Sequence, residues 1–187
     1  MCPQPDTLGT PAAYLDAERR AETKSEYFAG EVFAMSGASR RHNLIVGNLV
    51  RELGTQLRGR PCEVYPSDMR VKVAASGAYT YPDVVVVCGE PEFEDEHVDT
   101  LLNPTLLVEV LSPSTEVNDR VRNWQQYRRI PSLAEYVLVA QDQQRVEWYT
   151  RQQGGLWTFA EAAEADVLTL QSVGCHLALN DVYERAV

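Results

Sequence analysis

Several kinds of segment are missing from this 187-residue chain. The longest uninterrupted apolar run, residues 84–88, is far too short to cross a membrane. The cysteines lie far apart and form no C-x-x-C pair, which argues against a zinc cluster and against a small disulfide framework. We therefore expect reduced thiols at Cys2, Cys62, Cys88 and Cys175, two or three of them buried. The N-terminus lacks the basic and apolar regions of a secretion signal, so we expect a cytoplasmic location.

Positive charge is also scarce. Lys and Arg together number 17 against 27 Asp and Glu, which gives a formal net charge of −10, and only Lys24 and Lys72 are lysines. This acidic balance disfavours indiscriminate binding to nucleic acid. The arginines nevertheless gather beside two predicted helices, within residues 40–60 and 120–129. Local basic patches and ordinary solvated helix faces explain these clusters equally well.

The remaining composition, with 44% hydrophobic and 24% charged residues, is that of an ordinary globular protein. The length suits one domain with a substantial core, so residues 1–187 are predicted to form a single domain. Helices are predicted over residues 10–21 and 39–58, because the first starts at a Thr-Pro pair and the second repeats apolar residues every four positions. A hairpin is predicted between them, over residues 25–35.

Strands dominate the rest of the chain. They are predicted at residues 62–73 in two segments, at 78–89, at 105–111, at 134–142 and at 145–152, with a helix over 116–129 and short strands near the C-terminus. In the segments at residues 84–87 and 105–111, apolar and polar residues do not alternate. This is typical of central strands covered on both faces. The predicted fold class is α/β: a mixed β-sheet flanked by helices, with an N-terminal hairpin and extra C-terminal strands.

Two lone acids stand in the apolar strands. Asp83 follows Pro82 and precedes a run of valines, and Glu109 interrupts a run of Leu and Val. A buried carboxylate must be neutralised, paired or bound to metal, since leaving it unpaired costs several kcal/mol. Converging carboxylates favour a cation between them, and Mg²⁺ or Mn²⁺ suits oxygen ligands. The spacing is equally compatible with an ion pair from Glu109 to Arg70 or Lys72.

Three short motifs at these strands carry a resemblance. They are Tyr81-Pro82-Asp83, Val108-Glu109-Val110 and Ser112-Pro113-Ser114. In this order they resemble the PD-(D/E)XK restriction-endonuclease-like superfamily, and most closely its large bacterial Uma-type branch. Further positions that look like this branch are Glu26-Tyr27, Gly30-Glu31, Met35 and His42 upstream, and Tyr127, Pro131-Ser132-Leu133 and Glu135-Tyr136 downstream. The resemblance runs from about residue 12 to residue 183.

The resemblance implies a restriction-endonuclease-like core and a metal-dependent endonuclease that hydrolyses DNA. Asp83 and Glu109 would hold Mg²⁺ or Mn²⁺, and the backbone carbonyl of Val110 would add an oxygen. Glu31 would be a third acidic ligand, and His42 would touch the metal's water or the phosphate. At a helix start, His42 also fits an ordinary capped or surface histidine. DNA and a second copy in a homodimer are the implied partners; neither an organic cofactor nor a membrane is expected.

The signature lysine of the superfamily is absent. Leu111 stands two residues after the glutamate, and Asn123 stands four residues before the tyrosine, where this branch usually carries the lysine. That lysine is thought to orient the attacking water and to offset charge on the phosphate. Asn123 can hydrogen-bond a water but supplies no charge. Arg120, on the same helix face as Asn123, and Lys72, on a neighbouring strand, are the candidate replacements.

Two functional hypotheses follow, and a third remains open. The chain is either an active metal-dependent endonuclease or a catalytically degenerate relative that binds nucleic acid or protein. Arg122 is not predicted to replace the lysine, since on an α-helix it points about 100° away from Asn123. The third hypothesis is a protein-interaction module in which Glu109 is merely paired with a cation.

Overall fold

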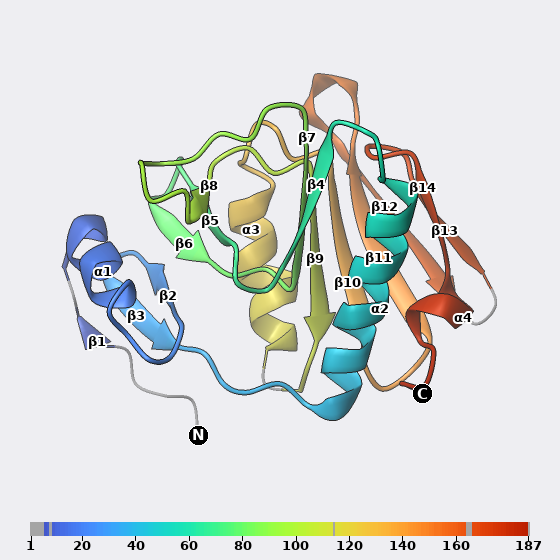
Figure 1. The fold of residues 1–187 in the computed structure, drawn as a ribbon, viewed down its shortest axis with the longest axis horizontal. Coiled ribbons are helices and arrows are strands. Elements are labelled where there is room, and N and C mark those ends of the chain that lie inside the picture. The colour runs from blue at the N-terminus through green and yellow to red at the C-terminus, as the bar shows by residue number, and fades with distance from the viewer. Residues whose placement is uncertain (1–5, 8, 114, 164–165, 187) are drawn as a thin grey trace.

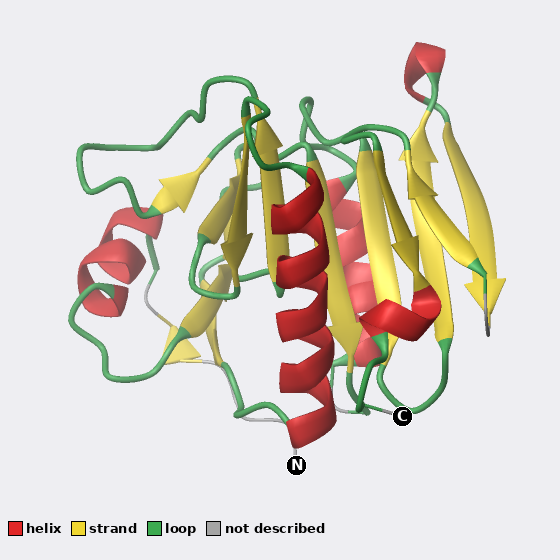
Figure 2. Cartoon of the chain, turned by 45° about the vertical axis from the view of Figure 1, so that its right-hand side comes forward, coloured by secondary structure: helices red, strands yellow, loops and turns green. Residues whose placement is uncertain are grey.

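The computed structural model describes residues 6–7, 9–113, 115–163 and 166–186, and their strands form two six-stranded sheets and one two-stranded sheet (Figures 1 and 2). The first sheet has the order β1 (Asp6–Thr7), β3 (Glu31–Ala34), β2 (Ser25–Phe28), β6 (Ala78–Thr80), β5 (Arg70–Val73), β8 (Thr100–Leu101). The second has the order β12 (Trp157–Ala163), β11 (Arg145–Arg151), β10 (Glu135–Ala140), β9 (Leu106–Leu111), β7 (Val84–Cys88), β4 (Cys62–Pro66). The third pairs β13 (Val167–Leu170) with β14 (Cys175–Ala178).

Helices cover both faces of the second sheet (Figure 2). They are α2 (Arg40–Gln56) on one face, and a π-helix, η1 (Asn118–Asn123), continued by α3 (Trp124–Tyr127), on the other. The shorter helices are α1 (Pro11–Glu18), α4 (Leu179–Val182) and the 3-10 turn η2 (Gln153–Gly155). Among the residues described, no helix combines the length and apolar character needed to span a membrane.

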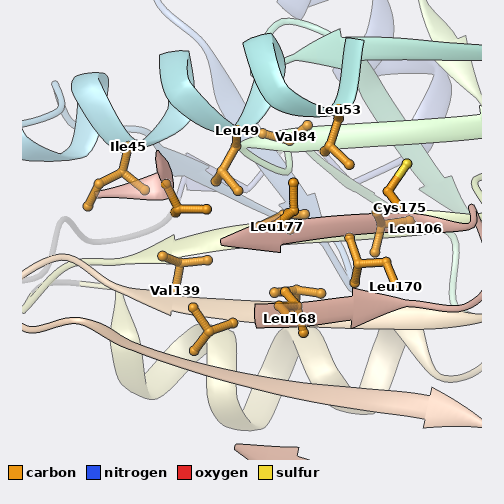
Figure 3. Packing of buried hydrophobic residues seen from close by; sticks show 14 of the residues in the cluster. Ile45, Leu49, Leu53, Val84, Leu106, Val139, Leu168, Leu170, Cys175 and Leu177 are labelled. Atoms are coloured by element: carbon orange, nitrogen blue, oxygen red, sulfur yellow. The ribbon is translucent and has the colours of Figure 1, made fainter. Parts of the chain in front are cut away.

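Strand β9 is buried on both faces, as predicted for a central strand. Its even-numbered residues pack with Ile45, Leu49 and Leu53 of α2, and part of this core is seen in Figure 3. Leu107 and Leu111 join the opposite core, which includes Tyr127 of α3. Since side chains alternate along a strand, Glu109 belongs to the face that α3 covers.

The predicted α/β class with helices flanking mixed sheets is confirmed, but the strands divide into two six-stranded sheets rather than one. In the second sheet β9 runs parallel to β10 and antiparallel to β7. The chain crosses between the sheets at residues 81–83, which connect β6 to β7. Pro82 has no N–H to donate to a ladder, so the pairing of β6 cannot continue directly into β7. Residues 81–83 are called the sheet junction below.

The expectation of reduced thiols is wrong for one pair of cysteines. Cys62 and Cys88 form a disulfide that joins β4 to β7. They are direct partners in the antiparallel ladder, although 26 residues apart in sequence. Sequence spacing does not reveal such a cross-strand neighbour. Cys175 is a free, buried thiol as expected, whereas Cys2 lies outside the described residues.

The acidic stretch at residues 90–99 is held by arginines. Arg19 binds Asp95 at 2.8 Å and Asp99 at 2.9 Å, and Arg70 also binds Asp99 at 2.9 Å. Arg70 is buried, with 4% of its side chain exposed, and the carboxylate of Asp99 compensates its charge. We call residues 90–99 the acidic loop.

The aromatic residues of the C-terminal strands pack largely within the chain itself. Trp124 stacks on Tyr149 with ring centroids 4.0 Å apart and meets Trp157 edge-on at 5.0 Å. Phe159 contacts Tyr149 but remains 55% exposed. These aromatic residues therefore contribute to the packing of a single chain. The homodimer stays a prediction.

Candidate active site

Asp83 and Glu109 meet at the sheet junction. β7 starts directly after Asp83, and its first residue, Val84, pairs with Val108 of β9. The backbone N–H of Asp83 lies 3.4 Å from Oε2 of Glu109. The backbone N–H of Val110 donates to Oδ2 of Asp83 at 2.7 Å. The register of β7 on β9 therefore places the two lone acids side by side.

His42 contacts the same carboxylate from α2. Its Nε2 lies 3.1 Å from Oδ2 of Asp83, and 14% of its side chain is exposed. Ser39 caps α2 by accepting a hydrogen bond from the backbone N–H of His42, so the imidazole sits in the first helical turn. Burial disfavours the charged imidazole, but the hydrogen bond and the charge of Asp83 outweigh it, and the pKa of His42 is raised. His42 is thus a partly buried partner of Asp83 rather than a surface residue.

Glu109 is held by a tyrosine that links both sheets to α3. The Tyr127 hydroxyl lies 2.9 Å from Oε1 of Glu109 and 3.0 Å from Oγ1 of Thr80, at the end of β6. With one proton, Tyr127 donates to the carboxylate and accepts from Thr80. Burial raises the pKa of Glu109 well above its usual value, and the charges of Asp119, Asp83 and Glu26 raise it further.

Two further acids complete this group. Asp119 lies in η1 and Glu26 in β2, and both are buried or nearly so. Burial, with the charges of Glu26 and Asp83, raises the pKa of Asp119 to about 7. Burial likewise raises the pKa of Glu26. The four carboxylates Glu26, Asp83, Glu109 and Asp119 are called the acid cluster below.

The position at which the family pattern places the lysine belongs to this cluster. The amide of Asn123 is buried and donates to Oδ1 of Asp119 at 3.0 Å. Asn123 therefore lies against an acid of the cluster, as a lysine in its place would. Because its amide is neutral, it contributes a hydrogen bond and no charge.

The two candidate replacements for the lysine are engaged elsewhere. Arg120 donates from Nε to Glu116 at 2.8 Å and from both Nη atoms to Glu147 on β11. Lys72 forms an ion pair with Glu94 of the acidic loop. Within the described part of the chain, neither side chain hydrogen-bonds to Asp83 or Glu109.

The alternative in which Glu109 is simply paired with a strand cation is contradicted by these contacts. Arg70 binds Asp99 and Lys72 binds Glu94, whereas Glu109 accepts from Tyr127 and lies beside Asp83.

The third predicted acid, Glu31, lies apart from the cluster. It starts β3, is exposed, and pairs through its backbone with Phe28 of β2. Glu26, on the neighbouring strand, is the acid of this hairpin whose charge acts on Glu109 and Asp119. The sequence did contain a signal, since the pair Glu26-Tyr27 is among the positions that look like the Uma-type branch. Asp119, four residues before Asn123, carried no such mark.

The chemistry of the cluster fits a hard cation. Asp83 and Glu109 offer oxygen donors, and Oδ1 of Asp83 accepts no side-chain or backbone hydrogen bond from the described residues. Among these residues, no three His, Cys, Asp or Glu side chains are arranged as a ready metal site. A bound ion would therefore keep several waters, which is the usual state of Mg²⁺ in proteins.

Comparison with known sequences gives consistent matches. The Uma2 family model, described as "Putative restriction endonuclease", matches residues 11–180. "Uncharacterized protein sll1609" of Synechocystis sp. (strain ATCC 27184 / PCC 6803 / Kazusa) is 41% identical over 152 residues, covering 81% of this chain and 86% of the relative. "Uncharacterized protein slr1290" of the same organism is 34% identical over 174 residues, covering 93% and 90%.

A solved structure has the same fold. It is the crystal structure of a "putative nuclease belonging to DUF820" from Anabaena variabilis ATCC 29413. The two structures agree with a TM-score of 0.78 over 98% of this chain and 100% of the other. Their sequences are 20% identical, so this likeness establishes the architecture.

Proposed function

This chain belongs to the Uma2 family, described as "Putative restriction endonuclease", and from that membership we propose that it is a metal-dependent endonuclease that hydrolyses DNA phosphodiester bonds. The observation that carries the proposal is the acid cluster. Its largely buried carboxylates lie together, and fewer basic side chains than carboxylates are there to balance them. Proteins rarely retain such an arrangement without a cation to bind or a proton to transfer.

In this proposal Asp83, Glu109 and the carbonyl of Val110 hold Mg²⁺ or Mn²⁺. The ion, when bound, polarises a phosphoryl oxygen and makes its water more acidic. The residues around the ligands fix their orientation: Tyr127 holds Glu109, and the Val110 N–H holds Asp83. Removing such a supporting hydrogen bond typically lowers metal affinity or activity by about 10- to 100-fold.

Two other groups are proposed to act beside the ion. His42, bonded to Asp83, is placed to contact the metal's water or the phosphate. Glu26 takes the role of the third acid, which the sequence pattern had assigned to Glu31.

We further propose that the enzyme acts as a homodimer, since cutting a duplex needs two centres. A cytoplasmic location is part of the proposal, although the Cys62–Cys88 disulfide is a bond that cytosolic proteins rarely keep.

One observation favours a second candidate function. The residue at the lysine position is the neutral Asn123, bonded to Asp119. A degenerate nuclease that still binds nucleic acid or protein would retain the fold and the acids but lack turnover. In that case Asn123→Lys is expected to restore cleavage.

The test is nicking of supercoiled plasmid by the pure protein with Mg²⁺ or Mn²⁺. The active-enzyme proposal expects nicking by the wild type and none by Asp83→Ala, with both proteins folded by circular dichroism. Equal nicking by the two proteins would mean contamination or a different site. No nicking by folded wild type at any metal concentration would reject the proposal in favour of the degenerate relative.

A further inference from the structure

The acid cluster has a cation that the sequence pattern does not mark. The other nearby basic side chains are paired away from it, as Arg70 with Asp99, Lys72 with Glu94, and Arg120 with Glu116 and Glu147. Arg122 differs, because its Nη2 donates to Oε2 of Glu26 at 3.0 Å. Its charge also opposes the protonation of both Glu26 and Asp119. Besides His42, which contacts Asp83, Arg122 is therefore the basic side chain that is electrostatically part of the cluster.

The helix places Arg122 beside the acids. In an α-helix Arg122 would point about 100° away from Asn123 but would share a face with Asp119, three residues before it. Residues 118–123 form the π-helix η1, whose turn is wider than that of an α-helix. Within η1, Asn123 contacts Asp119 and Arg122 contacts Glu26, so both side chains meet the acid cluster. Single π-turns inside helices are frequent at functional sites.

The guanidinium is held in place yet retains capacity to bind. It lies over the ring of Phe33, 4.9 Å from the centroid, and 5.8 Å from that of Phe28. The side chain is 23% exposed. Of the five N–H donors of arginine, one binds Glu26, and the described residues offer the others no hydrogen-bond acceptor. A planar group with free donors beside a proposed metal site is suited to an anionic oxygen pair such as a phosphate.

We propose that Arg122 binds the scissile phosphate in this active site and supplies the positive charge that the lysine supplies in the superfamily. The inference rests on the proposed nuclease function. Two of the free donors contact non-bridging oxygens of the phosphodiester, while the Glu26 contact and the two phenylalanines keep the guanidinium oriented. Since arginine stays protonated, it contributes charge and orientation but accepts no proton.

The test compares two arginines of the same helix. Binding of a fluorescent DNA duplex is measured by anisotropy over a range of salt, with Ca²⁺ replacing Mg²⁺, and plasmid nicking is measured with Mg²⁺. Arg122→Ala is expected to weaken DNA binding about 10-fold and to reduce the slope of log affinity against log salt by about 1. Arg120→Ala removes the same charge from the same helix and is expected to leave binding and its salt slope unchanged.

Further variants separate this role from a structural one. Arg122→Lys keeps the charge and should retain most of the salt slope, whereas Arg122→Gln keeps much of the chain length and should behave like Arg122→Ala. Arg122→Ala combined with Asn123→Lys should regain nicking, because a charge returns at the position where the family carries it. A purely structural arginine predicts a lower melting temperature without a change in salt slope.

The possible failures are distinguishable. If wild type binds and nicks DNA while Arg122→Gln and Arg120→Ala match it in affinity, slope and rate, the Arg122 inference is overturned and the nuclease function stands. If folded wild type neither binds nor nicks DNA, the proposed function itself is overturned, and the inference about Arg122 falls with it.

Discussion

The molecule contains two groups of acids that differ in how their charge is balanced. In the acidic loop, Asp95 and Asp99 each bind Arg19, and Asp99 also binds Arg70. The hydrogen bond from Arg19 lowers the pKa of Asp95, and that of Asp99 to about 2. In the acid cluster the shifts are opposite: burial raises the pKa of Glu109 and Asp119. The pKa values of chemically similar carboxyl groups are therefore shifted in opposite directions within one chain.

The difference lies in the cations and in burial. The acidic loop is partly solvated and supplied with arginines, so its carboxylates stay ionised and hold segments together. The acid cluster is largely buried, and its basic neighbours are Arg122 at Glu26 and His42 at Asp83. Buried groups with strongly shifted pKa values are candidates for function, whereas paired ones usually serve the fold. The contrast between the acid cluster and the acidic loop can be tested directly by matched substitutions.

The largest expected effect separates the two groups by activity. Glu109→Gln keeps the shape of the side chain but removes its charge, so cleavage should fall by more than about 100-fold if a metal is held there. Glu94→Gln makes the same change in the acidic loop and should leave the rate within about 2-fold, by the usual effect of changes remote from a site. Initial rates of plasmid nicking check this. Equal losses in both variants would contradict the assignment.

The next largest effect is on stability, and here the acidic loop is expected to be the more important group. Asp99→Ala removes the shared partner of Arg19 and of the buried Arg70, and should lower the free energy of unfolding by about 2 kcal/mol. The measurement is urea unfolding followed by circular dichroism. Asp68→Ala removes an 86% exposed carboxylate that binds Lys24, and serves as the control with little expected change.

Neutralising an acid of the cluster should instead stabilise the protein. Asp119→Asn relieves repulsion from the other carboxylates and can keep the hydrogen bond to Asn123, so the free energy of unfolding should rise by about 1 kcal/mol in metal-free buffer. The same urea titration at pH 7 checks the change. A loss of stability would show that Asp119 is structurally balanced, like Asp99.

The smallest expected effect is a difference in pH dependence. The pKa of Asp119 rises from 3.8 to about 7 on folding, so between these values the folded state binds more protons and stability falls as pH rises. The pKa of Asp99 falls from 3.8 to about 2, so its contribution is lost as pH drops through that interval. Each slope is at most about 1.4 kcal/mol per pH unit.

Melting temperatures between pH 2 and 8 measure both slopes. Asp119→Asn should flatten the decline on the neutral side, and Asp99→Asn should flatten the decline on the acid side. If either substitution flattened the opposite limb, the two groups of acids would have been assigned the wrong way round.

The sequence allowed the main architecture to be predicted where its signals were local. The periodic apolar residues of α2 and the uniform apolar runs of β7 and β9 each correspond to observed elements. The two lone acids converge because those runs pair antiparallel, which the patterns made plausible. The division into two sheets depends on which strands pair with partners far away in the sequence. Local patterns and composition do not indicate that pairing.

The cation of the cluster escaped prediction for a physical reason. The prediction compared each side chain with Asn123 alone, at about 100° per residue, whereas the acid that Arg122 contacts lies on β2, which the helix pattern does not locate. Arg120, favoured by that rule, instead binds Glu116 and Glu147, and Arg122, disfavoured by it, reaches Glu26. Similarly, Glu31 and Glu26 lie on adjacent strands of one hairpin, and only the tertiary structure distinguishes them.

The sheet junction has a consequence for when the acid cluster forms during folding. The acids of the cluster come from β2, the junction itself, β9 and η1, and Tyr127 must pack before Glu109 acquires its hydrogen bond. An unfolded chain therefore carries these carboxylates as separate, solvated groups. The cluster and its shifted pKa values arise only once both sheets and α3 have come together, so the site is a product of the complete tertiary fold.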